Sequence, residues 1–564
     1  MIAGMFVVGT CFLLGGYFIY GRILERRYDV DPKRPTPAVT MSDGVDYVPA
    51  KVPMLFGHHF SSIAGAIPIV GPILAATAFG WLPPVLWILL GAVFVGGVHD
   101  FSALIASIRH KARSVGEIIG LYLSPTTYRL FLAFVWVALI YVLIVFVDLT
   151  AGTFAPPVAE LADKAKQAAA LHSSGTVATA SIIYIALALV FGLLVNANKI
   201  SLKVGSLIFV PLVFVALAVA RQFPLMSTSI PTVAHTDPKC LWGLILIGYC
   251  LVASILPVWM LLQPRDYLSS FLLFGCIVGG GIGLVITGST AQSHIPAFIG
   301  FHDAKLGFIF PALFITVACG AVSGFHAIVA SGTTAKQLPR ESAARPIAYG
   351  AMIVEAMLAL VALGALMIVR TPGATPQETF AVGMGKFLSV FGISASVGQT
   401  FALLALSTFL LTTLDTCTRL GRYILEELTG IKGAKVRVPT TIVTLAIPVF
   451  AVFARTDWRV VYSVFGSANQ LLAVFALLAI MVWRVHSRKS YFFVLWPMLL
   501  MLATTMTQLV TIVARGTAND VSVLVPVSAG VLLAIALALL GDTIRCWGRI
   551  TAKPVEEEAE AVTV

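Results

Sequence analysis

The sequence predicts an all-α polytopic membrane protein with about fifteen transmembrane helices, including a five-plus-five inverted-repeat core that contains two broken helices. Three observations predict this fold. Of the 564 residues, 59% are hydrophobic and only 11% are charged, and the mean hydropathy is +0.95. A water-soluble domain could not cover its surface with so few charges. Long apolar runs recur along the chain, and two of them carry prolines in their interior.

Apolar runs of roughly 17 to 25 residues, the length that crosses the hydrocarbon core, follow one another along the sequence. Positive charges come directly after the first run, so it is expected to be a retained span and not a cleavable signal peptide. The acidic segment 545–564 is expected to be a disordered cytoplasmic tail. The predicted spans are 2–21, 59–79, 83–108, 130–153, 178–195, 204–220, 241–262, 271–290, 308–334, 346–369, 398–416, 439–454, 462–483, 491–512 and 521–544.

The basic residues indicate the orientation of these spans. Most of the 37 Lys and Arg residues fall in alternate loops, such as the RHKAR run and KQLPRESAAR. Loops rich in Lys and Arg stay on the cytoplasmic side, which places the N-terminus outside and the C-terminus in the cytoplasm. The net charge of +11 therefore reflects topology. Membrane lipids are expected around the protein, and no nucleic acid is expected as a partner.

Two runs are predicted to be broken helices. The run SSIAGAIPIVGPILAATAFG begins at Ser61 and holds Gly65, Pro68 and Pro72 in its interior, where proline removes a backbone donor and glycine weakens the helix. The run SILPVWMLLQPRDYLSS begins at Ser254, carries two prolines and falls five spans later, in the opposite direction. These matching places predict an inverted repeat. The alternative is a pair of proline kinks filled by Ser or Thr side chains or by water.

Broken helices leave backbone N–H and C=O groups free near the midplane, where they can hold a ligand. Half-helix N-termini suit a carboxylate, and freed carbonyls suit Na⁺. For Gln263 the alternative role is a helix-end cap, and for His326 the alternatives are a proton relay or a core histidine bonded to a carbonyl. The residues predicted to bind substrate are Ser61, Ser62, Gly65, Pro68, Ser254, Pro257, Gln263 and His326.

Specific motifs run across most of the chain, namely GPILAATAFGWLPPVLWILLGAVFVGGVHDFSALIASIRHKARSVGEI (71–118), QPRDYLSS (263–270), SGFHAIVASGTTAKQL (323–338), LLTTLDTCTRLGRYI (410–424) and FGSANQLLAVFALL (465–478). Together they resemble the carbon starvation protein A family. Members are bacterial inner-membrane proteins regarded as uptake systems for peptides or, in close relatives, for pyruvate by proton symport. The family is similar to the amino acid-polyamine-organocation transporters, which have a LeuT-like five-plus-five core.

The resemblance implies an organisation of the chain. One transmembrane helix and a cytoplasmic loop occupy 1–58, the ten-helix core occupies 59–416, and four further transmembrane helices occupy 417–544. In this architecture the eighth core helix often joins the first to hold a cation. Transferred by position, the residues that would face one another for this purpose are Ser61, Ser62 and Gly65 on one side, and Ser331, Thr333 and Thr334 on the other.

Two carboxylates inside predicted spans are candidates for proton coupling. Glu355, in AMIVEAMLAL, is roughly 15 Å into its span at 1.5 Å per residue, close to the midplane. A carboxyl is costly there unless it is paired or protonated, so Glu355 is predicted to load and release a proton. The alternative is a neutral Glu that links two helices. Asp100, beside His99, is predicted to serve a gate or proton path, or else a structural hydrogen bond.

Further polar residues lie near the ends of predicted spans. Arg265 and Asp266 sit where the second interrupted run reaches the cytoplasm, so they are predicted to be a gate pair, with a boundary salt bridge as the alternative. Asp415 and Arg419 are one turn apart and are predicted to form an ion pair that pins the last core helix. The amides of the SANQLL segment are expected to bond across helices, in support of a homodimer.

Missing motifs narrow the class of function. The sequence has no G-x-x-x-x-G-K-[ST], HExxH or GxSxG, and its seven cysteines show no CxxC spacing, so neither an ATP-driven pump, an enzyme, a cofactor nor a bound metal is expected. The predicted function is secondary active import of a small organic carbon nutrient, pyruvate or short peptides, by proton symport, which the resemblance ties to carbon starvation. The alternatives are a sodium-coupled importer, or a channel or nutrient sensor with the same fold.

Overall fold

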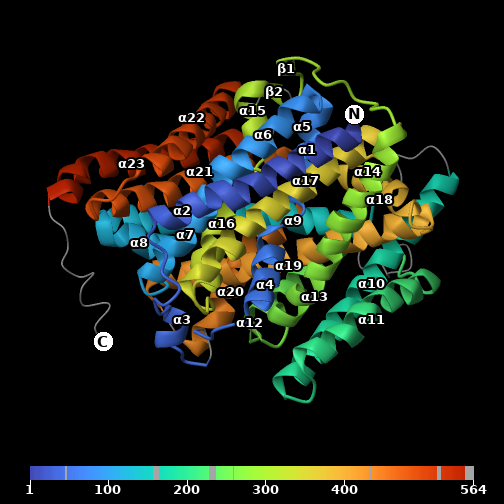
Figure 1. The fold of residues 1–564 in the computed structure, drawn as a ribbon, viewed down its shortest axis with the longest axis horizontal. Helices are drawn as coiled ribbons and strands as arrows, with labels where there is room; N and C mark the ends of the chain where they lie inside the picture. Colours follow the sequence, from blue (N-terminus) through green and yellow to red (C-terminus); the bar gives the residue numbers. More distant parts are fainter. Residues whose placement is uncertain are drawn as a thin grey trace.

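The computed structural model of the protein describes residues 1–44, 47–156, 164–227, 237–257, 259–431, 433–516 and 523–552. These residues are almost entirely helical, and the one sheet among them is a two-stranded antiparallel hairpin of β1 (His302–Asp303) and β2 (Gly307–Phe308). The helices pack into one bundle (Figure 1). The all-α multi-pass fold predicted from composition is confirmed.

Most of the helices that precede the β-hairpin fall on the predicted runs. They include a nearly continuous first span, the bent pair α4 and α5, and a hairpin of α10 and α11 that lies at one side of the bundle (Figure 1). Their bounds are α1 (Ile2–Gly15), α2 (Gly21–Arg27), α3 (Pro37–Thr40), α4 (Val52–Ile63), α5 (Ile67–Phe79), α6 (Leu82–Gly91), α7 (Gly97–Arg109), α8 (Val115–Tyr122), α9 (Pro125–Phe154), α10 (Lys164–Asn196), α11 (Leu202–Gln222), α12 (Pro238–Ile255), α13 (Leu262–Phe274) and α14 (Gly280–Thr290).

After the β-hairpin come two short helices, α15 and α16. Helices α17, α18 and α19 then pack against helices that precede the β-hairpin, and α22 and α23 lie beside α21 at the end of the chain (Figure 1). Their bounds are α15 (Ile309–Thr316), α16 (Gly324–Val329), α17 (Gly350–Ile368), α18 (Pro376–Ser389), α19 (Ala395–Thr429), α20 (Arg437–Phe453), α21 (Trp458–His486), α22 (Phe492–Arg515) and α23 (Leu524–Ala552).

Burial separates central helices from peripheral ones. The most apolar window of α21 is entirely buried and that of the α17 span is 89% buried, whereas the windows of α11 and of the α23 span are only 28% buried. All four are strongly apolar, so the exposed faces of α11 and α23 suit lipid and not water. The protein is therefore an integral multi-pass membrane protein with α17 and α21 at its centre.

Twelve helices in the described ranges are long and apolar enough to cross a membrane. Three predicted spans take other forms: 59–79 is the bent pair α4–α5, 439–454 is the shorter apolar helix α20, and 308–334 is interrupted. The helix lengths thus do not confirm the exact count of fifteen. Part of the predicted C-terminal tail, 553–564, lies outside the described residues.

The first predicted break is present. Helix α4 ends at Ile63, α5 starts at Ile67, and their axes differ by 43°. Pro68 occupies the first turn of α5, where its missing N–H costs nothing. A Cβ on Gly65 would lie 2.8 Å from Cε1 of Phe146 and 2.9 Å from Oγ1 of Thr413, so this position requires glycine for close approach of α9 and α19.

The second break was predicted in the wrong run. Most of the run 241–262 belongs to the unbroken helix α12, which ends at Ile255. Pro257 lies in the connection to α13, and Pro264 lies in the first turn of α13. The prolines therefore separate two spans. The interruption lies in 308–334 instead, where residues 317–323 separate α15 from α16. That run has one proline, Pro311, close to its start, so proline counting missed the break.

All seven cysteines are free. Cys11 is exposed and the other cysteines are buried.

Candidate functional site

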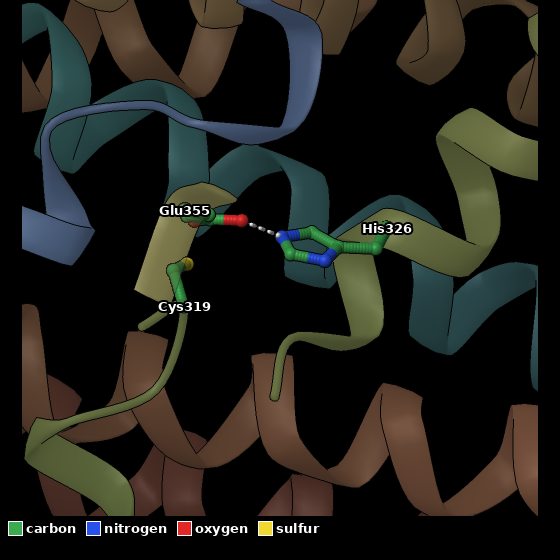
Figure 2. A group of neighbouring side chains, drawn as sticks. All are labelled: Cys319, His326 and Glu355. Atoms are coloured by element: carbon green, nitrogen blue, oxygen red, sulfur yellow. Dashed lines mark ion pairs between the residues drawn. The ribbon is translucent and has the colours of Figure 1, made fainter. Parts of the chain in front are cut away.

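Three side chains from the second interrupted span and the helix after it meet in the buried core (Figure 2). Cys319 belongs to the non-helical segment, His326 to α16 and Glu355 to α17. His326 and Glu355 are fully buried, and Nε2 of His326 lies 3.4 Å from Oε2 of Glu355. One ligating atom from each of the three residues lies within 4.8 Å of the others. Thiol, imidazole and carboxylate are groups that exchange protons and that also hold transition metals.

Asp100 of α7 joins this cluster from the opposite side of His326. Its Oδ2 lies 2.8 Å from Nδ1 of His326, and its Oδ1 lies 2.7 Å from Nδ1 of His99. The carboxylate thus orients the imidazole of His326 so that Nε2 points to Glu355 (Figure 2). Neither oxygen of Glu355 accepts a hydrogen bond from the described residues. A bare carboxylate is costly there, so the site favours a bound proton.

Two adjacent histidines of α4 connect this cluster to a second one. Nδ1 of His59 lies 2.8 Å from Oγ1 of Thr334, and Nδ1 of His58 lies 2.9 Å from Oδ2 of Asp266. Successive residues of a helix point in different directions, so the pair reaches both ways. His59 also interacts electrostatically with Asp100 and His326. The segment just before the first break therefore links the two groups of buried charges.

The second cluster surrounds Arg265, the largest fully buried side chain among the described residues. Its Nη2 donates to Oδ1 of Asp266 at 2.8 Å, and its Nη1 donates to the hydroxyl of Tyr249 at 2.7 Å and to Oδ2 of Asp415. The Tyr249 hydroxyl also donates to Asp415 at 2.8 Å. Arg265 and Asp266 do pair, as predicted, but inside the core and together with groups from α4, α12 and α19.

The predicted cation residues make separate contacts. Ser331 donates to the carbonyl of Ala327 at 2.7 Å, and Thr333 donates to that of Val329 at 2.9 Å. The Ser331 hydroxyl also accepts from the N–H of Val115 at 3.3 Å. Of the three predicted residues, Thr334 is the one with a hydrogen bond to α4, through His59.

The other predicted substrate residues lie around the first break and the connection between α12 and α13. Ser61 donates to the carbonyl of Asp266 at 2.9 Å, whereas Ser62 is fully buried with no hydrogen bond to the described residues. Gln263 donates to Oε1 of Gln337 at 3.1 Å. Ser254 lies 3.5 Å from Oγ1 of Thr441. Asp100, His326 and Glu355 are thus the predicted residues that the structure brings into one cluster from three separate runs.

Sequence reasoning missed three residues of these clusters, His58, His59 and Cys319. It also missed the pairing of Asp415 with Arg265. Arg419, expected to pair with Asp415, donates to the carbonyls of Ala253 and Leu256 at 2.9 and 2.5 Å. The signal for the histidines was available, because two adjacent imidazoles directly precede an interrupted apolar run. Partners distant in sequence have no such local signal.

Comparison with known proteins identifies the family of the chain. The profile of the family described as "Carbon starvation protein CstA" matches residues 2–374 and 367–508. The chain belongs to the CstA family. Among its relatives, "Peptide transporter CstA" of Escherichia coli is 32% identical over 89% of this chain and 80% of its own length. "Pyruvate/proton symporter BtsT" of the same organism is 36% identical over 65% of this chain and 49% of its own.

A manganese transporter of Eremococcus coleocola aligns in structure over 90% of this chain and 99% of its own, with 12% identity and a TM-score of 0.45. The CstA-family relatives are transporters, and this CstA-family chain is a membrane transporter and not an enzyme.

Proposed function

We propose that the protein is a secondary transporter that imports pyruvate or short peptides across the bacterial inner membrane by proton symport. Support comes from relatives named as a peptide transporter and as a pyruvate/proton symporter, each at least 32% identical. Both cargoes are small organic molecules that carry a carboxylate. We place the N-terminus outside, because Lys and Arg then gather on the cytoplasmic side.

The observation that carries the proton coupling is the buried cluster of Asp100, His326 and Glu355. Two carboxylates share one imidazole, at 2.8 Å and 3.4 Å, in a fully buried site. Such a site holds an extra proton when closed, because two unpaired negative charges in the core are costly. It releases the proton when a conformational change brings water to Glu355. Proton binding is thereby linked to the state of the transporter.

We infer that two repeats, roughly 52–290 and 309–486, rock against each other around the two breaks. With these bounds, helices at the same position in the two repeats pack against helices that also occupy the same position. In the first repeat α4 packs against α13, and in the second α16 packs against α21, while α9 and α19 pack against each other between them. In this pairing the α10–α11 hairpin is an insertion in the first repeat. Interrupted helices at equivalent places of two repeats are the arrangement that supports alternating access.

The test is uptake of labelled pyruvate by proteoliposomes under an inward proton gradient, at two pH values. We expect accumulation above equilibrium that a protonophore abolishes and that persists without sodium. Unlabelled pyruvate, dipeptides and tripeptides compete in parallel and identify the preferred cargo. Uptake that only equilibrates the label would indicate a channel, and uptake that requires sodium would indicate a sodium-coupled importer.

A further inference from the structure

We propose that Arg265 is the anchor for a carboxylate group of the cargo, and that Asp415 occupies this anchor as an internal substitute until the cargo displaces it. This inference rests on the proposed function, since it assumes a carboxylate-bearing cargo. It assigns to Arg265 a binding role in place of the gate role expected from its position in the sequence.

The two carboxylates at Arg265 are held differently. Asp266 is the next residue in the chain, and it accepts from Nε and Nη2 at 3.2 and 2.8 Å while its other oxygen faces His58 at 2.9 Å. Asp415 comes from α19 and contacts Arg265 through Oδ2 alone. Its Oδ1 is buried without a hydrogen bond from the described residues. Two N–H groups of the guanidinium therefore donate to Asp266 and one donates to Asp415, so we take Asp415 as the replaceable partner.

The charge count also makes Asp415 replaceable. One guanidinium faces two carboxylates, and all three side chains are fully buried. Asp266 alone neutralises Arg265, which leaves Asp415 as an excess negative charge in the core unless a proton compensates it. A cargo carboxylate can therefore take its place at Nη1 without changing the number of ion pairs.

Unsatisfied polar atoms lie on the helices that pack against Arg265. Ser62 Oγ and His58 Nε2 on α4, and Thr416 Oγ1 on α19, are buried and make no hydrogen bond with the described residues. Buried polar atoms normally have partners, so these are available to a bound molecule. The first break lies against the same stretch of α19, because Gly65 approaches Thr413, which is about 3 Å along the helix axis from Asp415.

The exchange has a consequence for protons. Asp415, once displaced, is a buried carboxylate without a cation, and a proton that arrives with the cargo neutralises it. One proton would then accompany each carboxylate that binds Arg265. The titratable or charged groups around Asp415 and Arg265 are His58 on α4, Tyr184 on α10, Tyr249 and Cys250 on α12, Asp266 on α13, and Cys417 and Arg419 on α19.

The experiment uses calorimetry to compare binding of an acid with binding of its amide, which lacks the carboxylate charge, to purified protein in nanodiscs. The probes are pyruvate with pyruvamide, and dialanine with dialaninamide. We expect the wild type to prefer the acid of its cargo pair, and Arg265→Gln to lose roughly 100-fold in affinity for the acid with little change for the amide. Arg422→Lys is the matched control, a buried arginine on α19 paired with Glu426 at 3.2 Å, and it should keep the preference.

Asp415→Asn provides an independent measurement that does not require loss of Arg265. Removing the internal competitor should tighten binding of the acid by roughly tenfold, and Arg265→Lys, which keeps the charge but not the fork, should weaken it to an intermediate degree. The inference is overturned if Arg265→Gln or Arg265→Lys keeps the full acid preference, or if Asp415→Asn binds the acid no more tightly than the wild type. Wild-type accumulation driven by protons would still support the proposed function in that case, whereas a wild type that binds neither acid refutes both.

Discussion

At the scale of single residues, the core places charges where lipid-spanning proteins rarely tolerate them. Glu355 has no hydrogen bond from the described residues and faces the imidazole of His326, which Asp100 orients from the other side. A glutamate placed only to link two helices would be expected to have a hydrogen-bond partner. The geometry therefore favours the proton-loading role of Glu355 over the helix-linking alternative.

We predict that Glu355→Gln abolishes uphill accumulation of the cargo but preserves exchange of labelled for unlabelled cargo, because the amide keeps the shape of the side chain and cannot carry a proton. Accumulation and counterflow in proteoliposomes measure the two activities separately. The control is Asp457→Asn, which removes a half-exposed charge paired with Arg459 at the start of α21. Full accumulation by Glu355→Gln would exclude Glu355 from coupling.

At the scale of elements, the break between α4 and α5 depends on the absence of a side chain at Gly65. A Cβ there would meet the ring of Phe146 and the hydroxyl of Thr413 at less than van der Waals distance. Phe146 is buried on the long helix α9 and Thr413 is buried on α19, so neither neighbour can move into solvent. The sequence revealed this break because its glycines and prolines act locally.

We predict that Gly65→Ala destabilises the protein by about 1–3 kcal/mol through overpacking and reduces transport by displacing α4 from α19. Thermal unfolding in detergent and uptake in proteoliposomes are the measurements. Gly248→Ala is the matched control, because a Cβ on this helical glycine of α12 has nothing within 4 Å. Equal melting temperatures for the two variants would contradict the close approach described at Gly65.

The second break shows where sequence reasoning fails. Prolines at 257 and 264 suggested an interrupted span, but proline is also tolerated between helices and in a first helical turn, which is where these two lie. The real interruption at 317–323 leaves no proline signature, because tertiary contacts hold it: Gln470 donates to the carbonyl of Val322 at 3.2 Å, and Asn469 accepts from the N–H of Phe325 at 3.0 Å. These bonds join residues 144 or more positions apart in the sequence, so the sequence around the break does not predict them.

At the scale of the whole molecule, a clamp of Arg34, Arg109 and Glu341 ties three distant segments together. Glu341, the first residue of the α17 span, is almost fully buried and accepts from Arg34 at 2.9 Å and from Nε of Arg109 at 2.9 Å. It also accepts from the N–H of Asp31 at 2.8 Å. The segment between α2 and α4 is thereby fixed to the end of α7 and to the start of the α17 span. We expect these ion pairs to break if this side of the protein opens.

We predict that Glu341→Gln loosens this side of the protein, because a neutral amide replaces the carboxylate that serves two guanidinium groups. The expected results are a melting temperature lower by several degrees, from a loss of about 1–3 kcal/mol, and faster cleavage of the 28–51 loop by added protease. The control is Glu25→Gln, which removes a single partner of Arg345. It should change the melting temperature and the cleavage rate less than Glu341→Gln does. An unaltered cleavage rate would show that the clamp does not hold the loop.

The distribution of thiols has a practical consequence for following such movements. Since Cys11 is the exposed member of a set that is otherwise buried and unlinked, replacing that one side chain should leave a background on which a single introduced cysteine reports its own water accessibility. A fluorophore or spin label could then be placed on either side of the bundle in an otherwise native chain, and the distance between two such labels would follow the transport cycle directly.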